Sequence, residues 1–487
     1  MEKLYTKRFD TGTVCDVTED FVLPDYIPEV RRVIGVRTVV SADGKYLSGD
    51  ELETEGGVTY NIMYMDNEGA VCTTSQNSSY NGRIPLSGSI DDDDRFTPQG
   101  VVVSTSVDSV NCRVTAPRKL TLSSKVRIRA QSERPVSVAM KHNSKNAGSH
   151  KVRRRNEEYR TAAAAEFRRT GECGGEFRER GEMEVVMAFG ELCLDGKLTS
   201  GALRVGGDAY VTAVMRSPEG AYVTSKSRVP VEEEITLPDV TQSEERFAAV
   251  FGNVVLLELE SDDSGVMSWR MEYDIDCDIM TCGCAEYTAD AYMTGCMDNT
   301  ETASIEAVCP AGAVNGRLTT QTQLKLKPGM TYVASWGRAS AEKCEITDSR
   351  CVISGSAYIS VVEAGGGEAV LDEAVIPFRY EFDGYAKQAD FKPDGRVEVR
   401  VTDIQAHADG ESLGLTAELS VAAMLLCRES VRYVSAISAV EDAPAFASSA
   451  ENMIRIYSPD DGETAWDVEK RFRLGREPRM EGEIYII

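Results

Sequence analysis

Hydrophobic and polar residues alternate along most of this chain. The alternation is clearest at 58–64, 209–214 and 357–362, where β-branched and aromatic residues are frequent. A period of two is typical of strands with one buried face and one solvated face. Helical patterns are few, and we expect helices only at 157–169, around four alanines, and at 467–472. The pattern therefore predicts a mainly β protein.

One predicted strand, 271–279, carries acidic side chains on one face and apolar side chains on the other. The carboxylates are Glu272, Asp274, Asp276 and Asp278. Paired carboxylates can serve acid–base chemistry, but a solvated strand face accounts for this row better. We expect these four side chains to face water.

A plan of glycines and prolines occurs three times along the chain. In each copy a glycine opens a strand, a second glycine marks the following turn, and a proline comes after the hairpin. The members are Gly57, Gly69 and Pro85, then Gly207, Gly220 and Pro230, then Gly355, Gly367 and Pro377. Glycine adopts the positive φ of a hairpin turn, and proline favours edge strands. The spacing predicts three diverged copies of one β module.

The chain of 487 residues is long enough for about three domains. We expect tandem antiparallel β-sandwich or barrel-like modules at 10–135, 160–285 and 286–435. The polar stretch at 136–159 contains Arg153, Arg154 and Arg155 and is typical of an exposed basic linker. A patch that holds an acidic partner is the alternative interpretation. A second predicted linker, 441–451, is rich in alanine, serine and proline.

The charge balance excludes some partners. With 53 Lys and Arg against 79 Asp and Glu, the net charge is −26, which disfavours nucleic acid and anionic lipid as partners. The three histidines, His142, His150 and His407, leave little room for histidine chemistry. Phosphate-binding loops, zinc-protease and serine-hydrolase motifs do not occur, and the acidic run 91–94 lacks the spacing of a calcium loop. We expect no enzyme activity, no cofactor and no metal.

Thirteen cysteines are spread along the chain. Five of them cluster in sequence, namely Cys277, Cys282, Cys284, Cys296 and Cys309. No C-x-x-C pair occurs, so buried free thiols are a better interpretation than a metal site or cross-links. Residues 1–5 do not resemble a secretory signal, and no apolar run reaches the ~18 residues of a membrane span. We expect a cytoplasmic protein.

The first module resembles a known family. Its entry has Pro24 and Pro28 followed by Glu29, then the Gly57 strand, then Arg118-Lys119-Leu120. These features resemble the SPOCS domain, a spore coat-associated β module of endospore-forming clostridia. The second module lacks the proline pair, and the third keeps Ile376-Pro377-Phe378. The resemblance covers most of residues 10–435.

The C-terminal segment, 452–487, resembles a second family. Gly462-Glu463-Thr464-Ala465-Trp466 is similar to the Gly-Asp-Thr-Leu-Trp turn of LysM modules, and 481–487 is similar to the closing strand. Only 473–480 separate the two parts, so the second LysM helix is missing. The resemblance implies a small, truncated α+β module whose partner-binding residues are Ile456, Tyr457, Gly462, Thr464, Trp466 and Phe472. Trp466 has two interpretations, as a core anchor of the module or as an exposed binding aromatic.

Several SPOCS-like modules followed by a LysM-like module imply a non-enzymatic spore-coat morphogenesis protein. On this resemblance it works in the mother-cell cytoplasm at the forespore surface. There it docks on the ATP-hydrolysing coat-basement protein of the SpoIVA type and on other coat proteins. The alternative from the LysM resemblance is binding of peptidoglycan or another glycan. An enzyme of unfamiliar type has only the thiol cluster in its favour.

Overall fold

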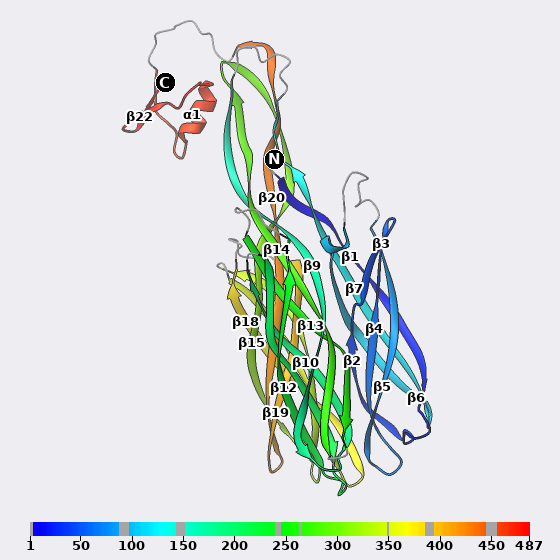
Figure 1. Cartoon of the computed structure of the whole chain (residues 1–487). Coiled ribbons are helices and arrows are strands. Elements are labelled where there is room, and N and C mark those ends of the chain that lie inside the picture. The colour runs from blue at the N-terminus through cyan, green and yellow to red at the C-terminus, as the bar shows by residue number, and fades with distance from the viewer. Residues whose placement is uncertain are drawn as a thin grey trace.

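The computed structural model of the chain is almost entirely β, which confirms the predicted fold class (Figure 1). It describes residues 3–86, 97–142, 151–199, 201–238, 245–262, 265–347, 350–384, 394–444 and 455–487. The acidic run 91–94, His150 and most of the predicted linker 441–451 lie outside these ranges.

The strands fall into three successive groups and a small C-terminal group. The first group is β1 (Lys3–Val22), β2 (Arg32–Val40), β3 (Gly44–Ser48), β4 (Glu51–Met65), β5 (Val71–Pro85), the 3₁₀ turn η1 (Pro98–Gly100), β6 (Val102–Ala116), β7 (Lys119–Ser137) and β8 (Lys141–His142). The second is β9 (Val152–Arg180), β10 (Glu184–Leu198), β11 (Ala202–Arg216), β12 (Tyr222–Thr236), β13 (Glu245–Ser261) and β14 (Val266–Met293). The third is β15 (Cys296–Lys325), β16 (Thr331–Thr347), β17 (Arg350–Gly365), β18 (Glu368–Asp383), β19 (Asp394–Asp409) and β20 (Ser412–Pro444). The last is β21 (Ile456–Tyr457), the helix α1 (Ala465–Phe472), β22 (Arg479–Glu481) and β23 (Ile484–Ile486).

The first three groups share one topology, and we call them modules 1, 2 and 3. A first strand is followed by an antiparallel meander, and then by a hairpin whose second strand pairs with the first strand of the module. These closing pairs are β1 with β7, β9 with β14, and β15 with β20. Each module is thus a sandwich of two sheets, and each encloses its own apolar core.

The glycine plan has a packing cause. Gly56, Gly207 and Gly355 lie inside β4, β11 and β17 rather than at strand openings, and Gly56 takes the place expected of Gly57. A Cβ atom at these positions would come within 2.1, 2.2 and 2.0 Å of a neighbouring backbone carbonyl oxygen, that of Ser41 just after β2, Cys193 in β10 and Ser340 in β16. Only glycine therefore fits at this point of each meander.

The turn glycines and the prolines of the plan lie in hairpin turns and on edge strands. The turn glycines Gly69, Gly220 and Gly367 have φ values of 87°, 86° and 77°, as hairpin turns require. All three prolines lie on the edge strands β5, β12 and β18. Pro230 and Pro377 pair with the residue after the meander glycine, whereas Pro85 pairs with Glu51 and is not their equivalent.

The three meanders close into a ring. The last strand of each meander contacts the first strand of the next, as β5 with β10, β12 with β16, and β18 with β2. Ion pairs cross the three junctions, namely Arg37 with Glu191, Lys226 with Asp403, and Arg31 with Glu368. Met63, Val214 and Trp336 belong to one apolar cluster that draws on all three modules. The modules therefore form one body.

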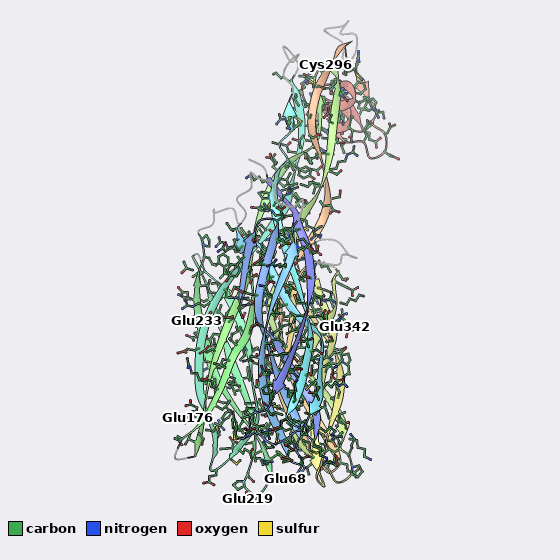
Figure 2. The ribbon with its side chains drawn as sticks, turned by 90° about the vertical axis from the view of Figure 1, so that its right-hand side faces the viewer. Glu68, Glu176, Glu219, Glu233, Cys296 and Glu342 are labelled. Atoms are coloured by element: carbon green, nitrogen blue, oxygen red, sulfur yellow. The ribbon has the colours of Figure 1, made fainter. Side chains whose placement is uncertain are left out.

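Four strands are much longer than the body and extend from one end of it (Figure 1). We call the outer parts of β9, β14, β15 and β20 the stalk, which comprises 152–160, 284–306 and 429–444. Apolar side chains such as Ala291, Met293 and Val434 pack inside it. Figure 2 shows Cys296 at the tip of the stalk, with the hairpin residues Glu68 and Glu219 at the opposite end of the molecule.

The predicted helix at 157–169 is wrong, because these residues form part of β9. Ala162 and Ala164 are buried at the junction with module 3, where small side chains let the strands approach closely. Alanine favours a helix only weakly, and tertiary packing overrides this preference. Since β9 begins at Val152, Arg153, Arg154 and Arg155 also lie in a strand and not in a connector.

The expectation that the acidic row of 271–279 faces water is wrong for its central residues. Asp274, Asp276 and Asp278 are 8%, 2% and 0% exposed. They lie on β14, the central strand of its sheet, and the face that carries them is covered by module 3. Both faces of this strand are therefore buried, which alternation alone does not reveal.

Buried cations compensate these carboxylates. Arg168 donates to Asp276 at 2.7 Å, and Arg396 of module 3 lies 3.4 Å from Asp276 and 3.6 Å from Asp278. The Arg396 guanidinium also stacks over the Phe251 ring at 3.9 Å. No described residue donates a hydrogen bond to the Asp278 carboxylate, and burial raises the pKa of this group well above its ordinary value.

Candidate functional site

The C-terminal module folds around one short helix. Thr464 caps α1, since its hydroxyl accepts from the Asp467 amide at 3.3 Å and its own amide donates to the Asp467 carboxylate at 2.9 Å. Gly462 has a φ of 81° in the turn before the cap. Two of the six predicted binding residues, Gly462 and Thr464, thus shape the entry to the helix.

Three others lie on the small sheet or at the end of the helix. The rings of Tyr457 and Phe472 meet edge to face at 5.1 Å. The Tyr457 hydroxyl donates to Glu463 at 2.8 Å, and Val468 and Tyr485 of the same module are buried. Ile456, by contrast, is 69% exposed. It is an apolar side chain of this set that a partner could cover without rearrangement of the module.

Trp466 points at the stalk. Its indole Nε1 donates to Asp290 at 2.9 Å, and its ring meets the Tyr292 ring at 5.3 Å with an interplanar angle of 60°. Lys470 donates to the same carboxylate at 2.5 Å. Burial opposes ionisation of Asp290, but the hydrogen bonds from Lys470 and Trp466 outweigh it and hold the pKa of Asp290 below its ordinary value.

Further polar contacts complete this interface. The Tyr292 hydroxyl has one proton to donate, and two acceptors lie within reach of it, the Leu474 carbonyl at 2.7 Å and Glu469 at 3.0 Å. Arg153 donates to Glu469 at 2.9 and 3.2 Å. Arg473 pairs with Asp298. We call the stalk residues Arg153, Asp290, Tyr292 and Asp298 the seat of the C-terminal module.

The seat answers two questions that the sequence left open. Trp466 is half-buried, yet it packs against another part of the chain and not inside its own module. Arg153 of the basic stretch does hold an acidic group, but that group is Glu469 of the same chain. The six predicted residues are thus divided between turn, core, seat and surface, and binding of a partner by any of them stays a prediction.

The seat residues were missed because no local signal marks them. Asp290 and Lys470 are 180 positions apart in the chain. The alternating pattern of β14 continues without change to its end, and only the arrival of α1 distinguishes Asp290 and Tyr292 from their neighbours. A contact of this kind depends on tertiary structure.

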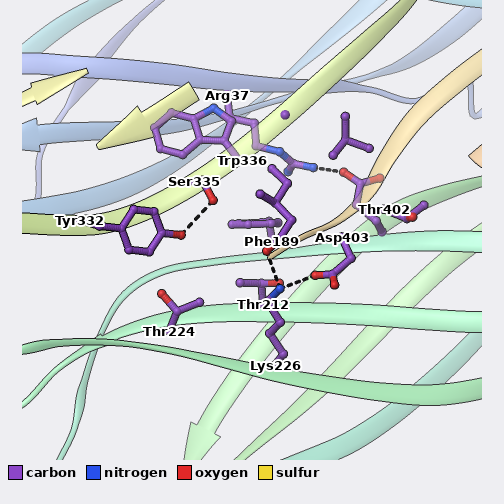
Figure 3. Close-up of a pocket in the computed structure, with 14 residues that line it drawn as sticks. Arg37, Phe189, Thr212, Thr224, Lys226, Tyr332, Ser335, Trp336, Thr402 and Asp403 are labelled. Carbon is purple, nitrogen blue, oxygen red and sulfur yellow. Dashed lines mark hydrogen bonds and ion pairs between the residues drawn. The ribbon is translucent and has the colours of Figure 1, made fainter. Parts of the chain in front are cut away.

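The meander junctions contain little free space. Figure 3 shows one pocket where Arg37, Phe189, Tyr332 and Trp336 converge from three modules. Tyr332 and Ser335 hydrogen-bond at 2.9 Å there. The free volume is about 10 Å³, which is enough for roughly one water molecule. This pocket is therefore a packed junction and not a ligand site.

A larger cleft of about 420 Å³ lies between modules 1 and 2. Its charged groups are largely paired with each other or with neighbours. Lys45 donates to Glu166 at 2.8 Å and to the Val101 carbonyl at 2.6 Å, while Arg168 is bound to Asp276 at 2.7 Å. The polar groups of the cleft serve to join the modules.

The five clustered cysteines do not come together. Cys277 lies in the module 2 core, Cys282 at the junction with module 3, Cys284 on the surface, Cys296 in the stalk and Cys309 in the module 3 core. Within the described ranges, no group of three His, Cys, Asp or Glu side chains is placed to hold a metal ion.

Comparisons with known proteins found no matching family model, no matching curated protein and no matching solved structure. Among the described residues no helix is long and apolar enough to cross a membrane. The function is therefore inferred from the chain itself.

Proposed function

We propose that this protein is a non-enzymatic scaffold of spore-coat assembly, which acts on the forespore surface in the mother-cell cytoplasm. The observation that supports the proposal is that the chain has three structurally distinct parts. A body of three interlocked modules supports a stalk, and the stalk supports a separate small module. A rigid spacer with a presented module is suited to hold other proteins at a set distance.

The C-terminal module is the proposed docking element. Its helix is occupied by the seat, so the face left for a partner is the outer face of its sheet, which carries Ile456 at 69% exposure. By family resemblance the partner is the coat-basement ATPase of the SpoIVA type, and other coat proteins are further partners. The order of modules resembles that of the spore morphogenesis protein SipL.

Deletion of residues 452–487 tests this proposal. We expect the shortened chain to keep the thermal unfolding transition of the body and to lose its place around the forespore, as seen with a fluorescent fusion in sporulating cells. Normal encasement of the forespore by the shortened chain would contradict docking through this module.

A point variant makes the test sharper. Ile456→Ser should weaken capture of the purified coat-basement ATPase about tenfold or more, because an interface anchor is lost. Val375→Ser is the matched control, since Val375 is 56% exposed on module 3, far in sequence from the C-terminal module. Equal capture by both variants would contradict a role for the outer face of the small sheet.

Binding of peptidoglycan or another glycan by the LysM-like module is the alternative. It has less support, because in the described segment 473–478 no second helix follows α1 and Trp466 is engaged with the seat. A peptidoglycan pull-down decides between the two. Retention of the protein well above that of a Trp466→Ala variant would favour the glycan.

A further inference from the structure

Two cysteines that are far apart in the sequence lie directly opposite each other in the structure. Cys309 on β15 pairs in register with Cys427 on β20. Opposite residues of an antiparallel pair point to the same side of the sheet, and their Cα atoms are typically about 4.5–5.5 Å apart. A disulfide needs a Cα separation of roughly 4.4–6.8 Å. The register therefore places the two residues within the range of Cα separations that a cross-strand disulfide needs.

The surroundings keep the two thiols together. Both side chains belong to the apolar core of module 3, at 7% and 1% exposure, so neither can turn into solvent without disturbing that core. The neighbouring Cys351 is engaged elsewhere, since its thiol donates to the Ala311 carbonyl at 3.4 Å. Cys427 is thus the thiol that faces Cys309 across the pair.

The two thiols also differ in acidity. Hydrogen bonds from Cys427 and from the Tyr159 hydroxyl lower the pKa of Cys309, whereas the hydrogen bond to Cys309 and burial raise the pKa of Cys427. A thiolate is the reactive form towards oxidants. Cys309 is therefore the more readily ionised thiol of the pair.

We propose that Cys309 and Cys427 form an oxidisable dithiol, and that its disulfide fastens the base of the stalk. This inference does not depend on the proposed function. The oxidant is a peroxide, small enough to reach a nearly buried sulfur. The Cys309 thiolate attacks one peroxide oxygen and becomes a sulfenic acid as hydroxide leaves. The Cys427 thiol then attacks that sulfur, the S–S bond forms, and its proton leaves with the hydroxyl group as water.

The position of the pair gives the cross-link its effect. Just beyond Cys309 and Cys427, β15 and β20 leave the module and continue into the stalk, where Glu306 pairs with Ser430. The bond would join the first and last strands of module 3 and enclose the whole of 310–426 in a covalent loop. Such a loop limits the freedom of the unfolded chain, so it resists opening of the module.

Hydrogen peroxide and the purified full-length chain test the proposal. After oxidation, free thiols are blocked and the chain is cut with trypsin and a glutamate-specific protease. These cuts yield 307–317 with Cys309 alone and 419–428 with Cys427 alone. We expect mass spectrometry to find these two peptides linked, and to find the link lost after reduction. The linked chain should lose two of its 13 thiols and run faster on a non-reducing gel.

Two variants and one competing product keep the test decisive. Cys427→Ala should abolish the linked peptide, and Cys344→Ala, a variant of another module 3 cysteine, should leave its yield unchanged. Cys282 lies at the junction near Cys309 but is not its strand partner. A native chain that links Cys309 to Cys282 as often as to Cys427, or that loses only exposed thiols such as Cys284, would overturn the proposal.

Discussion

The body and the C-terminal module are both held by charged side chains, but in different environments. In the body, the side chain of Arg396 is 4% exposed and Asp278 is fully buried. In the seat, Arg153 and Lys470 are 38% and 39% exposed. The same pairing chemistry therefore operates largely without water in the body, whereas two cations at the seat are partly exposed to water.

This difference in exposure determines how much each ion pair contributes to stability. Removing one partner of a buried ion pair leaves an uncompensated charge and costs about 3–5 kcal/mol, whereas exposed pairs contribute about 0–1 kcal/mol. We infer that the three modules of the body cannot separate without unfolding. The C-terminal module can leave its seat while the body stays folded.

The largest predicted effect tests the buried side of the comparison. Arg396→Met keeps much of the side-chain volume but leaves Asp278 without a cation and Asp276 with Arg168 alone, so the free energy of unfolding should fall by about 3–5 kcal/mol. Urea denaturation measures it. Arg204→Met is the control, because Arg204 is 69% exposed beside Glu234. Similar losses for both variants would show that burial does not separate the two classes of pair.

A second effect on the body comes from its backbone. Gly355→Ala places a Cβ atom about 2.0 Å from the Ser340 carbonyl oxygen, so the strands must shift and stability should fall by about 1–3 kcal/mol. Gly206→Ala is a matched control, since a Cβ atom there meets nothing within 4 Å. Thermal unfolding of both variants measures the difference, and an unchanged midpoint for Gly355→Ala would be inconsistent with the close approach.

The share of the fold and of its contacts that the sequence predicts also differs between regions. Alternation predicted the strands, the glycine plan predicted the repeated meander, and the short pattern at 467–472 predicted α1, because each signal is local. The burial of Asp276 depends on Arg396, 120 positions away. The strand at 162–165 depends on close packing at the junction with module 3. Whether a second layer of the protein covers a strand face depends on tertiary structure, which no short segment of the sequence reveals.

The seat is tested by a change that should act on the C-terminal module alone. Glu469→Gln weakens the contacts with Arg153 and Tyr292, and docking should lose about 1–2 kcal/mol. Hydrogen exchange of the α1 amides should quicken about tenfold while the body amides keep their rates. Glu483→Gln, on the exposed turn before β23, is the control. Exchange of body and α1 amides quickening together would contradict an independently detachable module.

The smallest predicted effect is a difference between the body and the seat in how their stabilities depend on pH. Glu133 of module 1 accepts from the Ala164 amide of module 2 at 3.4 Å, and burial raises its pKa to about 7. A folded-state pKa above the unfolded value means that this group stabilises the fold fully below about pH 4.5. That contribution is lost as the pH rises through about 7. Asp290 of the seat has the opposite sign, because its lowered pKa gives stability that is lost only in acid.

Raising the pH from about 5 to 8 should therefore weaken the body and leave the seat intact. Because Glu133 is partly exposed, its share should be on the order of 1 kcal/mol. Glu133→Gln should reduce the dependence of body stability on pH without removing it, because Asp278 keeps its raised pKa. Urea denaturation at a series of pH values measures the change. Glu342→Gln, an exposed change on module 3 (Figure 2), should preserve the wild-type slope. Release of the C-terminal module from its seat over the same pH interval would contradict a lowered pKa of Asp290. It would mean that burial raises the pKa of Asp290, as it raises the pKa of Glu133.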